Sequence, residues 1–220
     1  MQIITPSVAI MSDLNGLDLL KQIEAAGRTC YKSEERINTD SAIEFAQNII
    51  KRGHEAVLEH GSITVKFIVD RGVSHELVRH RIASFCQEST RYCNYSKGRF
   101  GGQITVVKPC FFNEDSKEYD AWFEACQNAE ASYFKLLEMG CKPQEARSVL
   151  PNSLKTEVVM TANPREWRHF LKLRTSKAAH PQMREVVIPL LWKLQTEVPV
   201  LFEDITIQEP IVFKKYGERA

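Results

Sequence analysis

The irregular order of strand-like and helix-like segments is the feature that most constrains the fold of this chain. Segments rich in β-branched residues, which favour strands, lie at residues 1–10, 62–69, 103–109 and 153–163. Helical spacing of apolar residues occurs at residues 16–27, 38–53, 72–82, 115–139, 163–179 and 181–198. Because the two kinds do not alternate strictly as β-α-β units, the pattern favours an α+β fold with a mostly antiparallel or mixed central sheet flanked by helices.

Capping residues mark several ends of these helices. Gly27, Gly53 and Gly140 each follow an amphipathic stretch and are expected to end it, since glycine readily adopts the left-handed conformation of a helix terminus. Pro164 is expected in the first turn of its helix, where the missing N–H is not needed.

Composition limits both the architecture and the location of the protein. With 220 residues and 43% hydrophobic content, residues 1–220 are expected to form a single domain with a full core. No apolar run approaches the ~18 residues of a membrane span, and the first residues do not resemble a secretory leader. We therefore expect a cytoplasmic protein without a membrane partner. The formal charge of only +1 argues against a nucleic-acid partner.

One arginine lies in an unexpected position on the helix predicted at 163–179. Apolar residues share one face of this helix: Trp167, Phe170, Leu171 and Ala178. Arg174 falls within that face, where a guanidinium costs several kcal/mol unless an anion or a set of acceptors meets it. Two interpretations are open at this point: an internal ion pair or a stem reaching solvent, and contact with a bound ligand.

A second group of arginines lies in the helix predicted at 72–82. Arg81 falls among apolar positions of this helix, whereas Arg79 points elsewhere, because consecutive helical residues are about 100 degrees apart. The segment from residue 79 to residue 99 contains five Lys and Arg residues and only one acidic residue. Arginine recognises phosphates with two parallel hydrogen bonds and stacks on flat rings, so this stretch predicts a local anion site.

Other common site patterns are absent. His54, Glu55 and His60 do not match the spacing of a helical H-E-x-x-H zinc site, so no metal is expected. No glycine-rich phosphate loop follows a predicted strand. The six cysteines contain no C-x-x-C pair, and we expect them to be reduced and mostly structural.

The residues from Arg79 onward carry a resemblance to a known family. Arg79, His80 and Arg81 are followed by seven residues and then by Ser89, which resembles the R-H-R-(x)7-S signature of the flavin-dependent thymidylate synthases. The segments "GHEAVLEH", "EARSVLP" and "TANPREWRHFLKLR" resemble further parts of the same family, from about residue 25 to about residue 195.

This resemblance implies a homotetrameric methyltransferase that converts deoxyuridine monophosphate (dUMP) to thymidine monophosphate (dTMP). Methylenetetrahydrofolate would supply the carbon, and FAD reduced by NADPH would supply the hydride. The implied FAD-binding residues are His54, Arg79, His80, Arg81, Gln87, Asn163, Arg165 and His169. The implied dUMP-binding residues are Glu76, Arg79, Gln87, Glu88, Ser89, Thr90, Arg91, Arg147 and Arg174.

The resemblance also gives Arg174 a catalytic role beside the uracil ring. Methylation needs electron density at uracil C5, and a fixed guanidinium stabilises the negative charge that develops on the ring. No cysteine nucleophile is then required. The only Pro-Cys pair, Pro109-Cys110, is followed by Phe111 and not by the histidine of the unrelated cysteine-dependent enzymes.

Some positions depart from the family pattern, and two rival functions are open. Many relatives have asparagine at Cys86 and glutamate at Gln87, and His180 and Gln182 are also substituted. One rival is an RNA- or nucleotide-binding module that uses residues 79–99. The other is a different folate- and flavin-dependent methyltransferase acting on a nucleic-acid base.

Overall fold

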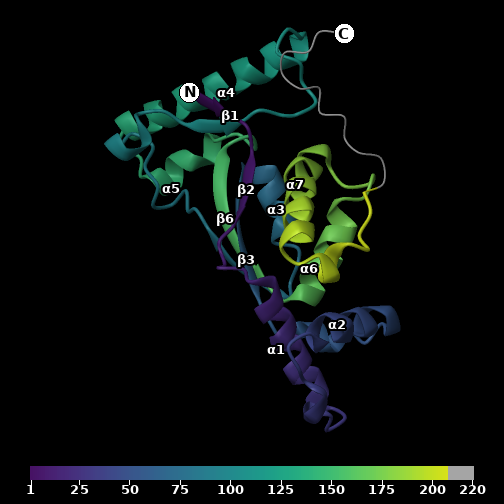
Figure 1. Cartoon of the computed structure of the whole chain (residues 1–220). Coiled ribbons are helices and arrows are strands. Elements are labelled where there is room, and N and C mark those ends of the chain that lie inside the picture. The colour runs from purple at the N-terminus through teal and green to yellow at the C-terminus, as the bar shows by residue number, and fades with distance from the viewer. Residues whose placement is uncertain (208–220) are drawn as a thin grey trace. The chain divides into compact units, whose positions relative to one another are not determined.

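The computed structural model describes residues 1–207, without the side chain of Arg99, and it has the α+β architecture that the sequence predicts (Figure 1). The strands are β1 (Gln2–Ile4), β2 (Ser7–Ile10), β3 (Ile63–Asp70), β4 (Ala83–Gln87), β5 (Thr105–Val107) and β6 (Lys155–Ala162). The α-helices are α1 (Gly16–Thr29), α2 (Ser41–Arg52), α3 (Arg71–Leu77), α4 (Lys117–Glu138), α5 (Pro143–Ala146), α6 (Pro164–Arg174), α7 (Pro181–Glu197) and α8 (Pro199–Phe202). The 3-10 helices are η1 (Glu34–Arg36), η2 (Glu55–Glu59), η3 (Gly98–Phe100) and η4 (Arg147–Val149).

The strands form two sheets. One has four strands in the order β2-β3-β6-β4, and the other pairs β1 with β5 in parallel, Ile3 opposite Val106. Within residues 1–207, no helix is both long and apolar enough to cross a bilayer.

The chain divides into two compact units, which are described separately. Unit 1 contains residues 1–7, 67–79 and 86–158, and unit 2 contains residues 8–66, 80–85 and the described residues from 159 onward. The expectation of one domain over residues 1–220 stays a prediction.

Unit 1 is built around the long helix α4. Its buried cluster consists of Tyr95, Ile104, Val106, Cys126, Tyr133, Ala146 and Leu154. Ser116 caps α4 by accepting a hydrogen bond from the backbone of Tyr119, and Gly140, at φ +90°, follows the helix as predicted.

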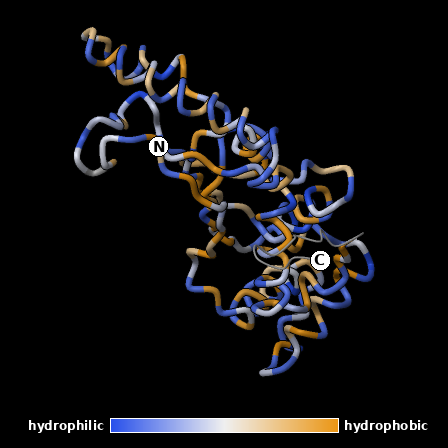
Figure 2. Tube along the Cα trace, turned by 90° about the horizontal axis from the view of Figure 1, so that it is seen from above, coloured by the Kyte–Doolittle hydropathy of each residue, from blue (hydrophilic) through white to orange (hydrophobic). Residues whose placement is uncertain are grey.

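Unit 2 is mainly helical, and α6 is central to its candidate site. Trp167 and Phe170 are fully buried, and the Trp167 indole donates to the carbonyl of Ile63 over 3.0 Å. The helices α1 and α2 pack against each other. Figure 2 shows hydrophobic and hydrophilic residues alternating along the helices, as expected where one face is buried.

Several predicted boundaries were wrong. The segment 1–10 forms two strands rather than one, with Thr5 and Pro6 between them, and Pro6 has no N–H for a ladder. Gly27 lies inside α1 instead of ending it. A side chain there would come within 2.4 Å of Phe45, so this glycine permits close helix packing.

The helix predicted at 72–82 ends at Leu77, so Arg81 does not lie on a buried helix face. Arg81 is exposed, and Val78 and Ile82, expected as its apolar neighbours, are 39% and 70% exposed. The helix predicted at 163–179 likewise ends at Arg174, and Ala178 is an exposed residue beyond it. In both cases a helical pattern continued past the point where packing supports a helix.

Candidate functional site

The residues expected to bind ligands fall into a set in unit 2 and a set in unit 1. In unit 2, the start of α6 is fixed by Asn163, whose side-chain oxygen accepts from the backbone N–H of Glu166 over 2.9 Å. Pro164 occupies the first turn, as predicted. The helix then carries Glu166, His169 and Arg174.

His80 lies against this helix between a carboxylate and a guanidinium. Its Nδ1 is 3.1 Å from Glu166 Oε1, and Arg174 Nε donates to its Nε2 over 3.0 Å. His80 and Glu166 are 5% and 7% exposed, and Arg174 is half-buried. The rings of Phe170 and His80 pack edge-on, with their centroids 4.8 Å apart.

The electrostatics of this cluster favour a neutral His80. Burial lowers the pKa of His80 below its usual value of 6.5, and the positive charge of Arg174 lowers it further. The hydrogen bond to Glu166 raises the pKa, but the net effect is a lowered pKa. The neutral form of the imidazole is therefore favoured at pH 7.

Three side chains of this cluster could in principle bind a metal. His80, Glu166 and His169 each offer one possible ligand atom, and these three atoms all lie within 4.8 Å of one another. However, Glu166 and Arg174 already engage both ring nitrogens of His80, and a metal would also meet the Arg174 charge. The expectation that the protein needs no metal stays a prediction.

A cavity of about 420 Å³ opens beside α6, and we call it the α6 cavity. Its lining residues are Glu55, Glu59, Ile82, Asn163, Arg165, Glu166, Arg168, His169 and Lys172. Three residues assigned to FAD thus share one cavity: Asn163, Arg165 and His169.

The arginines of the α6 cavity have carboxylate partners. Arg165 donates to Glu59 over 2.6 Å. Arg168 donates to both carboxylate oxygens of Asp204 at 2.7 Å each, and also to the carbonyl of Leu201. Arg168 is 2% exposed, so it is one of the arginines that the structure does bury.

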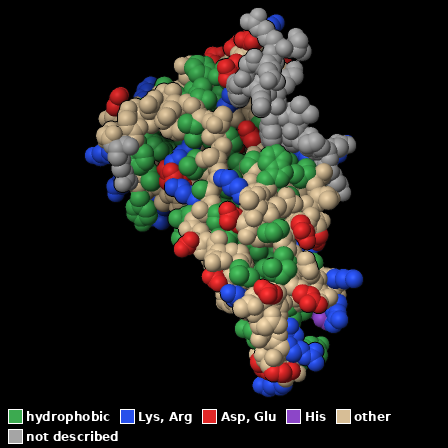
Figure 3. Space-filling view, in the orientation of Figure 1, with side chains coloured by type: hydrophobic (Ala, Val, Ile, Leu, Met, Phe, Trp, Pro, Cys, Tyr) green, Lys and Arg blue, Asp and Glu red, His purple; other side chains and the backbone are tan. Residues whose placement is uncertain are grey.

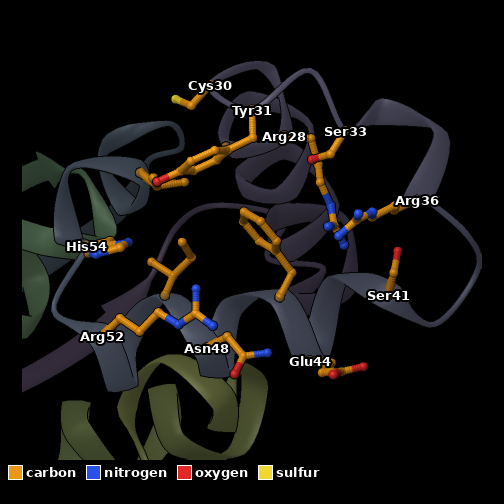
Figure 4. Close-up of a pocket in the computed structure, with 14 residues that line it drawn as sticks. Arg28, Cys30, Tyr31, Ser33, Arg36, Ser41, Glu44, Asn48, Arg52 and His54 are labelled. Atoms are coloured by element: carbon orange, nitrogen blue, oxygen red, sulfur yellow. The ribbon is translucent and has the colours of Figure 1, made fainter.

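A second cavity in unit 2, of about 710 Å³, lies between α1, α2 and the segment that joins them, and we call it the α1–α2 cavity (Figure 4). Figure 4 shows Tyr31 and Arg52 on opposite sides of this cavity and His54 on its wall. Basic and acidic side chains intermingle on the surface around the end of α1 (Figure 3).

The polar side chains of the α1–α2 cavity differ in how they are held. Arg28 donates to Glu24 Oε1 over 2.8 Å and 3.0 Å, and Glu24 is fully buried. Asn48, Arg52 and His54, in contrast, have no hydrogen-bond or ion-pair partner for their side chains among residues 1–207.

The set in unit 1 surrounds the end of β4. Gln87 donates to the hydroxyls of Ser74 and Thr156 over 3.0 Å and 3.3 Å. Arg147 donates to Thr90 over 3.2 Å. These contacts join residues that are far apart in the sequence: Thr90 and Arg147 are separated by 57 positions, and Gln87 and Thr156 by 69.

The next residues of this loop are less enclosed. The Ser89 hydroxyl accepts from the backbone N–H of Arg91 over 3.3 Å, and the Arg91 side chain is exposed over the ring of Tyr92. Glu88 accepts a hydrogen bond from Lys155 over 2.9 Å.

The structure separates some predicted residues and adds others. His54 lies in the α1–α2 cavity and not in the α6 cavity with the other unit 2 residues assigned to FAD. Glu76 is half-buried, and Arg79 and Arg81 are exposed. Sequence reasoning missed Glu166 and Lys155. Glu166 lies one turn before Phe170 and therefore on the apolar face of its helix, which is a weak sign of a buried carboxylate. Nothing in the sequence indicated that its partner is His80.

The solved structures that resemble this chain show the class of fold. The UMP/dUMP methylase PolB from Streptomyces cacaoi, bound with 5-Br dUMP, aligns with a TM-score of 0.73 at 24% identity, covering 92% of this chain and 96% of PolB. Its complex with 5-Br UMP gives a TM-score of 0.72. The chain therefore has the fold of this methylase.

The sequence comparisons define the family. The model of the thymidylate synthase complementing protein family matches residues 17–200. The flavin-dependent thymidylate synthase of Corynebacterium glutamicum is 34% identical over 215 residues, covering 90% of this chain and 83% of the relative. The enzyme of the same name from Mycobacterium tuberculosis is 34% identical over 220 residues, covering 92% and 85%.

The chain therefore belongs to the thymidylate synthase complementing protein family, that of the flavin-dependent thymidylate synthases. It is an enzyme of nucleotide biosynthesis, a methyltransferase. The resemblance inferred from the R-H-R-(x)7-S signature is thus confirmed.

Proposed function

We propose that this enzyme methylates dUMP to dTMP, with methylenetetrahydrofolate as carbon donor, NADPH as reductant and bound FAD as cofactor. The observation that carries the proposal is the gathering of Asn163, Arg165 and His169 in the α6 cavity, in a chain of this family. The family signature and the cavity thus indicate the same residues independently.

The side chains of the α6 cavity support the proposal that it binds part of a flavin nucleotide. Asn163, Arg165 and His169 offer amide, guanidinium and imidazole groups to phosphates and ring edges. Exposed Arg79 and Arg81, together with His54, His80 and Gln87, complete the proposed FAD set. When bound, FAD supplies the hydride that completes the new methyl group.

The proposed dUMP site uses the loop after β4. The residues that bind dUMP under this proposal are Glu76, Arg79, Gln87, Glu88, Ser89, Thr90, Arg91, Arg147 and Arg174. The exposed guanidinium of Arg91 can bind a phosphate with two hydrogen bonds. Arg147 holds Thr90 in position through the 3.2 Å hydrogen bond between them.

Arg174 is the proposed catalytic residue. Its guanidinium would stabilise negative charge on the uracil ring as the C5 carbon attacks, as donors do in an oxyanion hole. Its Nε–H is engaged by His80, which restricts how the planar guanidinium can rotate. We propose that no cysteine nucleophile takes part, because Cys110 lacks the following histidine.

The α1–α2 cavity is assigned to an anionic co-substrate. Arg52 offers hydrogen-bond donors without a protein partner among the described residues, and Tyr31 offers an aromatic ring. Methylenetetrahydrofolate carries carboxylates and NADPH carries phosphates, and both contain flat rings, so either matches this chemistry.

We further propose that the enzyme is a cytoplasmic homotetramer. Light scattering in solution tests the assembly, with an expected mass of four chains of 25.2 kDa each. A monomeric mass for the active enzyme would contradict this part of the proposal.

The visible spectrum of the purified protein tests the function. We expect a bound yellow flavin that is bleached by NADPH, and bleaching that depends on dUMP would connect three proposed ligands. Turnover of free dUMP, compared with UMP and with RNA, distinguishes this function from methylation of another base. Absence of flavin, together with RNA binding that weakens steeply with added salt, would instead favour the RNA-binding module.

A further inference from the structure

We propose that Glu166 is a positioning residue that acts on Arg174 through His80. The three side chains form one line of hydrogen bonds in unit 2, with Glu166 and Arg174 on α6 and His80 between them. The inference rests on the proposed function in one respect, since it assumes that Arg174 acts on the substrate.

The hydrogen-bond chemistry decides which nitrogen of His80 carries the proton. The Nε–H of arginine can only donate, so His80 Nε2 must accept with its lone pair across the 3.0 Å contact. A neutral imidazole then carries its proton on Nδ1, which donates to Glu166 Oε1 over 3.1 Å. The carboxylate and the guanidinium therefore select the same tautomer.

The surroundings hold this arrangement in place. The first turn of α6 favours a carboxylate, because the backbone N–H groups of a helix N-terminus point toward it. The side chain of Asn163 also accepts from the Glu166 backbone. On the next turn, the ring of the fully buried Phe170 packs edge-on with that of His80, with the ring centroids 4.8 Å apart. His80 thus has little freedom to turn.

Loss of Glu166 would remove one of the two groups that select this tautomer and leave the Nδ1 proton without its acceptor. His80 could then carry its proton on Nε2, which would direct an N–H toward the N–H of Arg174. The Nε–H of Arg174 would then meet an N–H in place of a lone pair, and we expect its guanidinium to shift from its present position. A misplacement of about 1 Å can lower turnover by about 100-fold, and we expect a loss of at least about 10-fold here.

A double-mutant cycle tests whether Glu166 acts through Arg174. We expect Glu166→Ala to lower kcat for dUMP by at least about 10-fold with a small change in KM, whereas Glu166→Gln should retain more activity because its carbonyl oxygen can accept the same hydrogen bond. In an Arg174→Ala background, Glu166→Ala should cause less than about a twofold further loss, because residues that act as a unit are not additive.

Glu24→Gln is the matched control. Glu24 is also a buried glutamate of unit 2 that accepts hydrogen bonds from an arginine, but its partner is Arg28. Any loss of kcat that it causes should be the same in the wild-type and Arg174→Ala backgrounds. Multiplicative losses for Glu166→Ala and Arg174→Ala, or no loss for Glu166→Ala, would overturn the positioning role.

The tautomer of His80 can be measured in the wild-type protein, so this test does not require any variant to fold. The ¹⁵N chemical shifts of the His80 ring in the wild-type protein should show a protonated Nδ1 and an unprotonated Nε2. A ring protonated at Nε2 would overturn the inference even if Glu166→Ala does not fold. A wild-type protein that does not methylate dUMP would instead refute the proposed function. Multiplicative losses in an enzyme that does methylate dUMP would refute only the positioning role of Glu166.

Discussion

The two cavities of unit 2 hold their charged groups in different ways. In the α6 cavity, Arg165 donates to Glu59 and Arg168 to Asp204. In the α1–α2 cavity, Arg28 is paired with Glu24, whereas Arg52 and His54 have no side-chain partners among residues 1–207. The two arginines of the α6 cavity are therefore held by carboxylates, whereas the α1–α2 cavity also contains Arg52 and His54, which have no such partner among residues 1–207.

This difference has a physical consequence for function. Groups that are already hydrogen-bonded need not reorganise when charge develops on a substrate, which is what electrostatic catalysis requires. Exposed cations without partners contribute binding energy mainly when an anion arrives. We therefore expect changes around α6 to alter turnover and stability, and changes at Arg52 to alter affinity.

Arg174→Ala should have the largest effect and tests whether the residues around α6 determine turnover. We expect the protein to keep its flavin and to lose turnover by roughly 100-fold or more, by analogy with the removal of one oxyanion donor. Steady-state kinetics and the visible spectrum measure the two quantities. Arg174→Lys should also fail, because a point charge cannot replace the planar guanidinium. Near-normal kcat for Arg174→Ala would refute the catalytic role.

Asp204→Ala tests whether the paired arginines of the α6 cavity stabilise the fold. Buried Arg168 would lose its carboxylate partner, and we expect a destabilisation of about 1–2 kcal/mol, reduced because Asp204 is partly exposed to solvent. Thermal unfolding measures the difference. Glu203→Ala, which changes the adjacent exposed residue, is the control and should leave the midpoint unchanged.

The same pair predicts how stability depends on pH. Hydrogen bonds from Arg168 lower the pKa of Asp204 below its usual value. The folded pKa of Asp204 is thus below the unfolded value of about 3.9, so the contribution to stability is complete above about pH 5 and is lost as the pH falls through the folded pKa. Wild type and Asp204→Ala should therefore converge in stability in acid. A difference that persists there would contradict this assignment.

Arg52→Ala tests whether the α1–α2 cavity determines the affinity for a co-substrate. We expect KM for one co-substrate, methylenetetrahydrofolate or NADPH, to rise about tenfold, which corresponds to about 1.4 kcal/mol, with little change in kcat. The substrate whose KM rises identifies the occupant of the α1–α2 cavity. Lys51→Ala, at the neighbouring exposed position outside the cavity lining, should leave both values unchanged. If Arg52→Ala also changes neither KM, the assignment of this cavity is wrong.

Cys110→Ala should have the smallest effect, because the proposed mechanism assigns catalysis to the Arg174 guanidinium and not to a thiol. Turnover should stay within about twofold of wild type, or about 0.4 kcal/mol. A folded Cys110→Ala protein without activity would contradict the proposed mechanism. Cys126→Ala offers a contrast, since Cys126 is buried in the unit 1 core and its replacement should lower stability instead.

Local patterns predicted the elements well where packing and propensity agree. Gly53, at φ +69°, ends α2, and Pro164 begins α6, as expected from their backbone chemistry. The prediction failed for Arg81 because the apolar pattern of residues 72–82 continues beyond Leu77, where the chain leaves the helix. Periodicity cannot show whether a neighbouring surface exists to cover an apolar face.

The sequence alone determined the α+β class, most helix and strand positions and, through its R-H-R-(x)7-S signature, the family of the enzyme. Only the tertiary structure decided that Glu166, His80 and Arg174 share one line of hydrogen bonds and that Asp204 pairs with Arg168. The physical reason is that caps and periodicity act over a few neighbouring residues. His80 meets Glu166 across 86 positions of sequence, and only the packing of the folded chain brings them together.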